Sequence, residues 1–236
     1  MRKLLCKLQY SIDVGIDFLV RNIDDDGYFC GEHDLSRHLL ATCCLSEHLG
    51  KDERLMKPLS VVSSFSYYDN GRIFLSDEHL NSLAAISFLS CGRNDFGIGY
   101  LKSIKNNSAQ DVEAFVVAFE KTEDKKWLDK AEMVTGQLQD SNDFWSTIAA
   151  EHYCRHRPDE KLKTFVKKAP WNIEDENELK AFAYNRIEKQ DCSPAPDRCG
   201  GFFDENGVRL DWSHENITIL KKILSRQEEK NKTKKI

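Results

Sequence analysis

The sequence predicts an all-α protein built from about six helical hairpins. Apolar residues recur at steps of three and four in most segments, which is the period of an amphipathic helix. Turn-forming residues, mainly glycine, asparagine and aspartate, separate these segments. The pattern of two helices then repeats along the chain, and the expected second helices begin 32 to 43 residues apart. Repetition at this spacing is typical of stacked supersecondary units.

The composition is that of an ordinary globular chain. Of the 236 residues, 40% are hydrophobic and 31% are charged, and the net charge of -5 argues against nucleic acid as the main partner. No stretch approaches the roughly 18 apolar residues of a membrane span. Lys7, Gln9 and Asp13 interrupt the apolar run near the N-terminus, so it does not resemble a signal peptide. We expect a soluble cytoplasmic protein with no membrane partner.

The first two hairpins show the plan most clearly. Apolar residues define a helix over residues 4–20, which ends at a turn of three aspartates followed by Gly27. The second helix covers residues 34–49 and stops at Gly50, a common C-terminal cap. A second pair of helices is expected over residues 52–68 and 76–90, with a turn at Asn70-Gly71 between them.

Three further pairs and a final helix follow. The pairs are expected over residues 95–104 with 110–121, 123–138 with 143–156, and 159–168 with 175–189. A loop rich in proline and glycine over residues 191–207 leads to the last helix, residues 211–226. Residues 227–236 are predicted to form a polar, disordered tail, which leaves a single domain over residues 1–226.

The second helix of each pair begins near an aspartate. These residues are Asp34, Asp77, Asp111, Asp143, Asp175 and Asp211. The second helices are also the more apolar of each pair, so we expect them inside and the charged first helices outside. Six such hairpins close into an α/α toroid with the N-termini of the inner helices at one polar mouth. An open solenoid and an irregular all-α domain are the alternatives.

Three turns that lead into inner helices combine glycine with aromatic residues. They are Asp26-Gly27-Tyr28-Phe29, Asn70-Gly71-Arg72-Ile73-Phe74 and Gly200-Gly201-Phe202-Phe203. This pattern resembles the glycine-aromatic turns of the α/α-toroid superfamily. It is similar to six-hairpin glycosidases and N-acylglucosamine 2-epimerases, and more distantly to terpenoid cyclases and prenyltransferase β subunits. The resemblance implies the fold, and one fold hosts many functions.

Three of the inner-helix starts pair an acid with a histidine. An aspartate at a helix start caps backbone N–H groups, which contributes about 0.5 to 2 kcal/mol and accounts for most of these aspartates. A carboxylate beside an imidazole also orients the ring and favours its charged form, which suits proton transfer. The predicted catalytic residues are Asp211, His214, Asp77, His79, Asp34 and His38. Glu215 follows Asp211 by one helical turn.

Aromatic and polar residues near the same rim are the predicted substrate-binding residues. They are Trp212, Trp145, Tyr28, Phe74, Phe203, Glu78 and Arg37. Sugar chemistry uses two carboxylates, or an acid and a base, about 5 to 10 Å apart, and sugar rings pack on aromatic faces. We therefore predict acid/base chemistry on a sugar or glycan: hydrolysis, elimination or epimerisation. A non-catalytic scaffold that binds a glycan, peptide or protein is the first alternative, and a terpenoid cyclase-like enzyme is the second.

Metal and cofactor sites are not predicted. Histidines and carboxylates at the rim are ordinary metal ligands, but no HExxH motif is present, so we expect no metal and no cofactor. Five of the eight cysteines lie in apolar helical patterns, as expected of reduced thiols: Cys6, Cys43, Cys44, Cys91 and Cys154. Cys192 and Cys199 flank the proline-rich loop, where a disulfide and a metal site both remain open. The sequence does not specify an oligomeric state.

Overall fold

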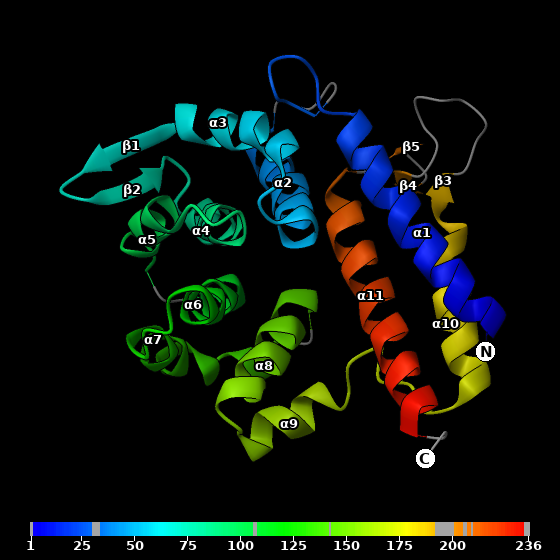
Figure 1. The fold of residues 1–236 in the computed structure, drawn as a ribbon. Coiled ribbons are helices and arrows are strands. Elements are labelled where there is room, and N and C mark those ends of the chain that lie inside the picture. Colours follow the sequence, from blue (N-terminus) through cyan, green and yellow to red (C-terminus); the bar gives the residue numbers. More distant parts are fainter. Residues whose placement is uncertain are drawn as a thin grey trace. The chain divides into compact units, whose positions relative to one another are not determined.

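The computed structural model is mostly helical, as the sequence predicts (Figure 1). It describes residues 2–29, 34–105, 108–141, 143–191, 201–204, 207–208 and 210–233. Within these ranges the chain forms eleven α-helices and a few short strands. The all-α class is therefore confirmed, while the closure of the hairpins into a toroid stays a prediction.

Every predicted helix is present in the described residues. The first helices of the pairs are α1 (Arg2–Arg21), α3 (Met56–Ser64), α5 (Asn94–Leu101), α7 (Lys126–Thr135) and α9 (Glu160–Val166). The second helices are α2 (Leu35–Leu49), α4 (Asn81–Ser90), α6 (Ala109–Thr122), α8 (Phe144–His156), α10 (Glu176–Glu188) and α11 (Leu210–Thr233). Short 3₁₀ turns precede α3 and α4 and follow α7: Glu53–Leu55, Glu78–Leu80 and Leu138–Asp140.

The second predicted helix pair is wrong in one place. The expected helix over residues 52–68 ends at Ser64, and the chain then forms an antiparallel hairpin of β1 (Ser66–Asp69) and β2 (Arg72–Leu75). Asn70 and Gly71, with φ of 48° and 75°, make the tight turn. Such positive φ values match the right-handed twist of paired strands, and the Tyr and Phe residues beside the turn favour extended backbone.

The prediction of a disordered polar tail is also partly wrong. Helix α11 continues to Thr233, so residues 227–233 are helical rather than disordered. Glutamate, lysine and glutamine have high helix propensity, and Gln227 is buried, which anchors the turn beyond Arg226.

The contacts divide the chain into two compact units. Unit 1 comprises Met1–Cys44 and Pro170–Ile236, and unit 2 comprises Leu45–Ala169. The boundary falls inside α2. The single toroid domain over residues 1–226 accordingly stays a prediction.

Unit 2 is a stack of helices around α4 and α6. Helix α6 packs against α4, α5, α7 and α8, and α8 also packs against α9 (Figure 1). Both central helices are buried over most of their length, α4 without interruption from Asn81 to Leu89 and α6 from Asp111 to Ala118. The expectation that second helices are the more buried ones therefore holds for α4 and α6.

Unit 1 contains α1, the part of α2 up to Cys44, α10, α11 and a small antiparallel sheet. The strands are β3 (Gln190–Asp191), β4 (Gly201–Asp204) and β5 (Gly207–Val208), in the order β3-β4-β5. Helices α1 and α11 lie side by side and approach closely at Gly15, where a Cβ atom would lie 3.1 Å from Ile217 and 3.2 Å from Phe202. Helix α10 departs from the predicted pattern, because only two of its described residues, Leu179 and Ala183, are buried.

No helix among the described residues combines the length and the apolar character that crossing a membrane requires.

The close packing of α5 on α4 gives a first prediction. A Cβ atom at Gly97 would lie 2.5 Å from Leu89 and 3.2 Å from the backbone oxygen of Ala85. We expect Gly97→Ala to lower the free energy of unfolding by about 1 to 3 kcal/mol, because a backbone atom cannot move aside easily. Urea denaturation measures the change.

Gly136→Ala is the matched control. Gly136 has helical dihedral angles, and no described atom lies within 4 Å of its added Cβ. The control should leave stability unchanged or raise it by up to about 1 kcal/mol, since alanine favours helical backbone. If the two variants were equally stable, the close contact of Gly97 with Leu89 and Ala85 would not be limiting, and the prediction would be wrong.

Candidate functional site

The predicted acids at the inner-helix starts act as helix caps. The Asp34 carboxylate accepts a hydrogen bond from the Ser36 N–H at 2.8 Å, and the Asp77 carboxylate accepts one from the His79 N–H at 3.1 Å. Both aspartates are exposed. Capping is therefore a sufficient role for each of them, and their predicted catalytic role stays a prediction.

Three further predicted aspartates also bond the first turns of their helices. Asp143 accepts from the Ser146 N–H, and Asp175 accepts from two N–H groups at the start of α10. Asp111 is buried and forms a capping box with Ser108 while accepting a hydrogen bond from Ser82 of α4. This last contact fastens α4 to α6 from within the core of unit 2.

The predicted histidines lie in three different environments. His38 is 1% exposed and is covered by the rings of Tyr28 and Phe29, with centroids 5.7 and 5.3 Å away. His79 is exposed beside Glu78, which pairs with Lys105. His214 is buried on α11, 3% exposed. The side chains of the remaining residues of that motif, Asp211 and Trp212, lie outside the described part of the structure.

The predicted aromatic platforms contact neighbouring rings or lie outside the described side chains. Phe74 stacks on Tyr67 with centroids 5.6 Å apart, and Trp145 is half-buried with its edge against Phe144. The backbone of Phe203 pairs with Val208 in the sheet, but its side chain is not among those described. Arg37 is half-buried on α2. Because these residues come from both units, their gathering at one mouth stays a prediction.

A pocket of about 580 Å³ lies between α10 and α11 of unit 1. Its described lining contains one aromatic ring, two cations, one carboxylate and two amides: Phe182, Arg186, Lys189, Glu215, Asn185 and Asn216, together with Ala181. The C-terminal half of α10 and its cap residue Lys189 supply one wall, and Glu215 and Asn216 of α11 supply the other. The pocket therefore lies on the helix that the sequence singled out, one residue beyond His214.

Arg186 organises the polar side of this pocket. Its guanidinium donates to the Asn216 side-chain oxygen at 2.8 Å and to the Glu215 carboxylate at 3.3 Å. The same guanidinium lies 5.3 Å from the centre of the Phe182 ring. Helix α10 places Phe182 and Arg186 four residues apart, so both side chains reach the same face. The result is a fixed group of donors and acceptors next to an apolar surface.

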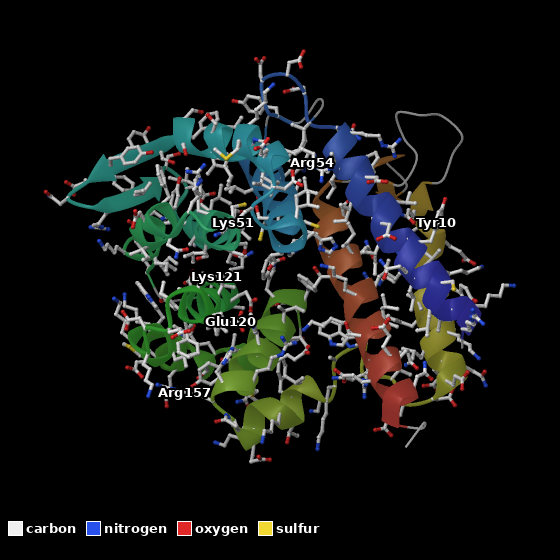
Figure 2. All side chains as sticks on the ribbon, in the orientation of Figure 1. Tyr10, Lys51, Arg54, Glu120, Lys121 and Arg157 are labelled. Carbon is white, nitrogen blue, oxygen red and sulfur yellow. The ribbon has the colours of Figure 1, made fainter. Side chains whose placement is uncertain are left out.

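A second polar cluster lies between α6 and α8 of unit 2, where Figure 2 labels Glu120. Glu120 Oε1 accepts hydrogen bonds from Nε2 of His152 at 2.9 Å and from Nε2 of His156 at 2.8 Å. The other ring nitrogen of His152, Nδ1, lies 2.7 Å from Glu113 Oε1. Glu113 and Glu120 are two turns apart on α6, and the histidines are one turn apart on α8, so each helix presents one face to the other.

The pKa values in this cluster are strongly shifted. Burial lowers the pKa of His152, but the charges and hydrogen bonds of Glu113 and Glu120 outweigh burial and raise it to about 10. The hydrogen bond from His152 lowers the pKa of Glu120 to about 2, with a further contribution from His156. At neutral pH, His152 is therefore a cation held between two carboxylates.

Neither group of residues was predicted as a site from the sequence. The signal for the α6–α8 cluster was present, because His152 and His156 are four apart on an expected helix and therefore share a face. Nothing in the sequence indicated that Glu113 and Glu120 would face them. Arg186 carried no motif, whereas Glu215 was visible beside the predicted Asp211 and His214.

Comparisons with protein-family models, curated proteins and solved structures found no match to this chain. The resemblance to α/α-toroid enzymes therefore stays a prediction.

The shifted pKa values predict how the cluster affects stability. The unfolded pKa of His152 is near 6.5 and the folded value is about 10, so its contribution is complete below pH 6.5 and is lost as the pH rises towards 10. Glu120 contributes fully above its unfolded pKa of 4.5, and this contribution is lost as the pH falls towards 2. Stabilisation by the cluster is thus greatest between these unfolded values.

Glu113→Gln removes one of the two charges that hold the His152 proton. We expect wild type to be more stable than this variant at pH 6. The difference in their unfolding free energies should become smaller by at least about 1 kcal/mol when the pH is raised to 10. Urea denaturation in EDTA-containing buffer at several pH values measures it. A difference that does not change with pH would contradict the coupling of His152 to Glu113.

Proposed function

We propose that unit 1 binds a sugar or a short glycan in the pocket between α10 and α11. The observation that carries the proposal is the combination, in one pocket, of a phenyl ring with a fixed Arg186–Glu215–Asn216 group. Its volume of about 580 Å³ is within the usual range for small-ligand pockets.

The chemistry of the lining supports this class of ligand. Each sugar hydroxyl both donates and accepts, so adjacent hydroxyls are satisfied by a guanidinium and a carboxylate that lie next to each other. Asn185 and Asn216 add amide groups with both capacities, and the Phe182 ring offers an apolar surface for the C–H face of a sugar. A polyisoprenoid would leave these polar groups desolvated, which disfavours the terpenoid alternative.

Turnover of the sugar is the further part of the proposal. Glu215 is the carboxylate among the described lining residues, and it lies 3.3 Å from the Arg186 guanidinium, so it is the candidate base. Acid/base chemistry on a glycan needs a second group, and Asp211 is the candidate that the sequence offers one helical turn earlier. Hydrolysis, elimination and epimerisation all remain predictions for this pair.

Binding can be tested with a panel of neutral, acidic and N-acetylated sugars and short oligosaccharides. Saturation-transfer NMR on the full chain identifies binders, and titration calorimetry gives their affinities. We expect Arg186→Ala and Glu215→Gln each to lower the affinity for the sugar at least about tenfold. Each substitution leaves sugar hydroxyls and a partner side chain without a hydrogen bond.

Lys180→Ala is the matched control on the same helix. Lys180 forms a surface pair with Glu176 and is not among the residues that line the pocket. Its removal should leave affinity unchanged and alter stability by less than about 1 kcal/mol. The proposal fails if no sugar of the panel binds, or if Arg186→Ala and Glu215→Gln bind as tightly as wild type while circular dichroism shows them folded.

A further inference from the structure

We propose that unit 2 binds a divalent transition-metal ion of the Zn²⁺ class through Glu120, His152 and His156, with Glu113 as the residue that positions His152. The residues named here come from α6 and α8, and none of them is among the described residues that line the sugar pocket. The evidence for the metal site is the convergence of the ligand atoms, the orientation of His152 and the composition of the donor set.

The three ligand atoms already point at one another. One carboxylate oxygen of Glu120 and one nitrogen from each histidine lie within 4.8 Å of one another. Ligand distances to zinc are about 2.0 to 2.2 Å, so the ligands of a tetrahedral ion are separated by roughly 3.3 Å. The two histidine nitrogens lie 2.8 and 2.9 Å from Glu120 Oε1, so these separations are less than 1 Å shorter than those between the ligands of a zinc ion. Small side-chain movements would therefore admit an ion in place of the bridging protons.

Glu113 occupies the position of a supporting residue in a metal site. Metal-bound histidines usually give their other ring N–H to a carboxylate, which fixes the tautomer and the orientation of the ring. Glu113 Oε1 lies 2.7 Å from His152 Nδ1, and the Glu113 side chain is 4% exposed. Its other oxygen, Oε2, is buried and has no hydrogen-bond partner among the described residues. Positive charge nearby, such as that of a metal ion, would offset the cost of burying a carboxylate oxygen that has no hydrogen bond.

A salt-bridge network between α6 and α8 is the competing explanation, and unit 2 contains such a network elsewhere. Arg157, labelled in Figure 2, pairs with Asp129 and Glu132 of α7. That pairing joins one cation to two separate carboxylates. His152 likewise lies between two carboxylates, but the cluster adds a second imidazole, His156, on the same oxygen of Glu120. Two imidazole nitrogens and one carboxylate oxygen therefore lie together, and these are the atoms with which proteins bind zinc.

The donor set indicates the kind of ion. Imidazole nitrogen with one carboxylate suits zinc, iron, cobalt and nickel, whereas magnesium and calcium prefer oxygen ligands throughout. Three protein ligands leave at least one coordination position for water, as in catalytic rather than closed structural zinc sites. The side chains of Glu120 and His156 are 35% and 25% exposed, so an ion has a route from solvent.

The test uses the full chain after dialysis against EDTA. Titration calorimetry with Zn²⁺ should show one equivalent bound, and Co²⁺ should give the visible absorption of a site with nitrogen ligands. Zn²⁺ should also raise the thermal midpoint of unfolding, because it binds the folded state. Mg²⁺ at the same concentration should produce neither heat nor a shift in midpoint.

Variants then locate the bound ion. Glu120→Gln and His156→Ala should each weaken Zn²⁺ binding at least about tenfold by removing a ligand, and Glu113→Gln should weaken it about 10- to 100-fold by releasing His152. His79→Ala is the matched control, since His79 is an exposed histidine of the same unit. A Cys192→Ser, Cys199→Ser double variant controls for the other pair that the sequence left open. Both controls should bind Zn²⁺ like wild type.

The proposal is overturned if wild type binds neither Zn²⁺ nor Co²⁺. It is also overturned if folded His156→Ala and Glu120→Gln retain full affinity, or if the cysteine double variant abolishes binding. Circular dichroism identifies variants that fail to fold. If Glu113→Gln unfolds, His156→Ala still tests the proposal, because His156 is the more exposed of the two histidines.

Discussion

The helices of this chain depend on burial against one another, because most are too short to be stable alone. Helices α5 and α9 have eight and seven residues, and isolated helices below about 12 to 15 residues are marginal in water. Their stability comes from contact with longer partners, such as α4 for α5 and α8 for α9. Capping aspartates add to this at the helix starts, as Asp159 does for α9.

This packing determines which polar groups are enclosed and how they are satisfied. At the contact of α4 with α6, Asp111 is buried but bonded to Ser82 and to the start of its own helix. At the contact of α6 with α8, Glu113 is buried against His152. The first arrangement completes a cap and closes the core. The second leaves a carboxylate oxygen unbonded among the described residues and is partly open to solvent, which is why it supports a binding site and the first does not.

The two proposed sites use helix pairs in different ways. In unit 1, α10 and α11 leave a pocket large enough for a small ligand, and Arg186 holds its polar groups in place. In unit 2, α6 and α8 are close enough for side chains to meet directly, so the space suits a single ion.

The sequence by itself determined the positions of the helices and their caps. Apolar period and turn residues act over a few positions, so the eleven helices were predictable, and so was Asp175 as the cap of α10. The β1–β2 hairpin was missed because the turn at Asn70-Gly71 fits a hairpin as well as a helix end. Tertiary structure alone decided which faces meet. Glu113 and His152 are 39 residues apart, and Arg186 and Asn216 are 30 apart, so their contacts depend on how whole helices pack and not on any local signal.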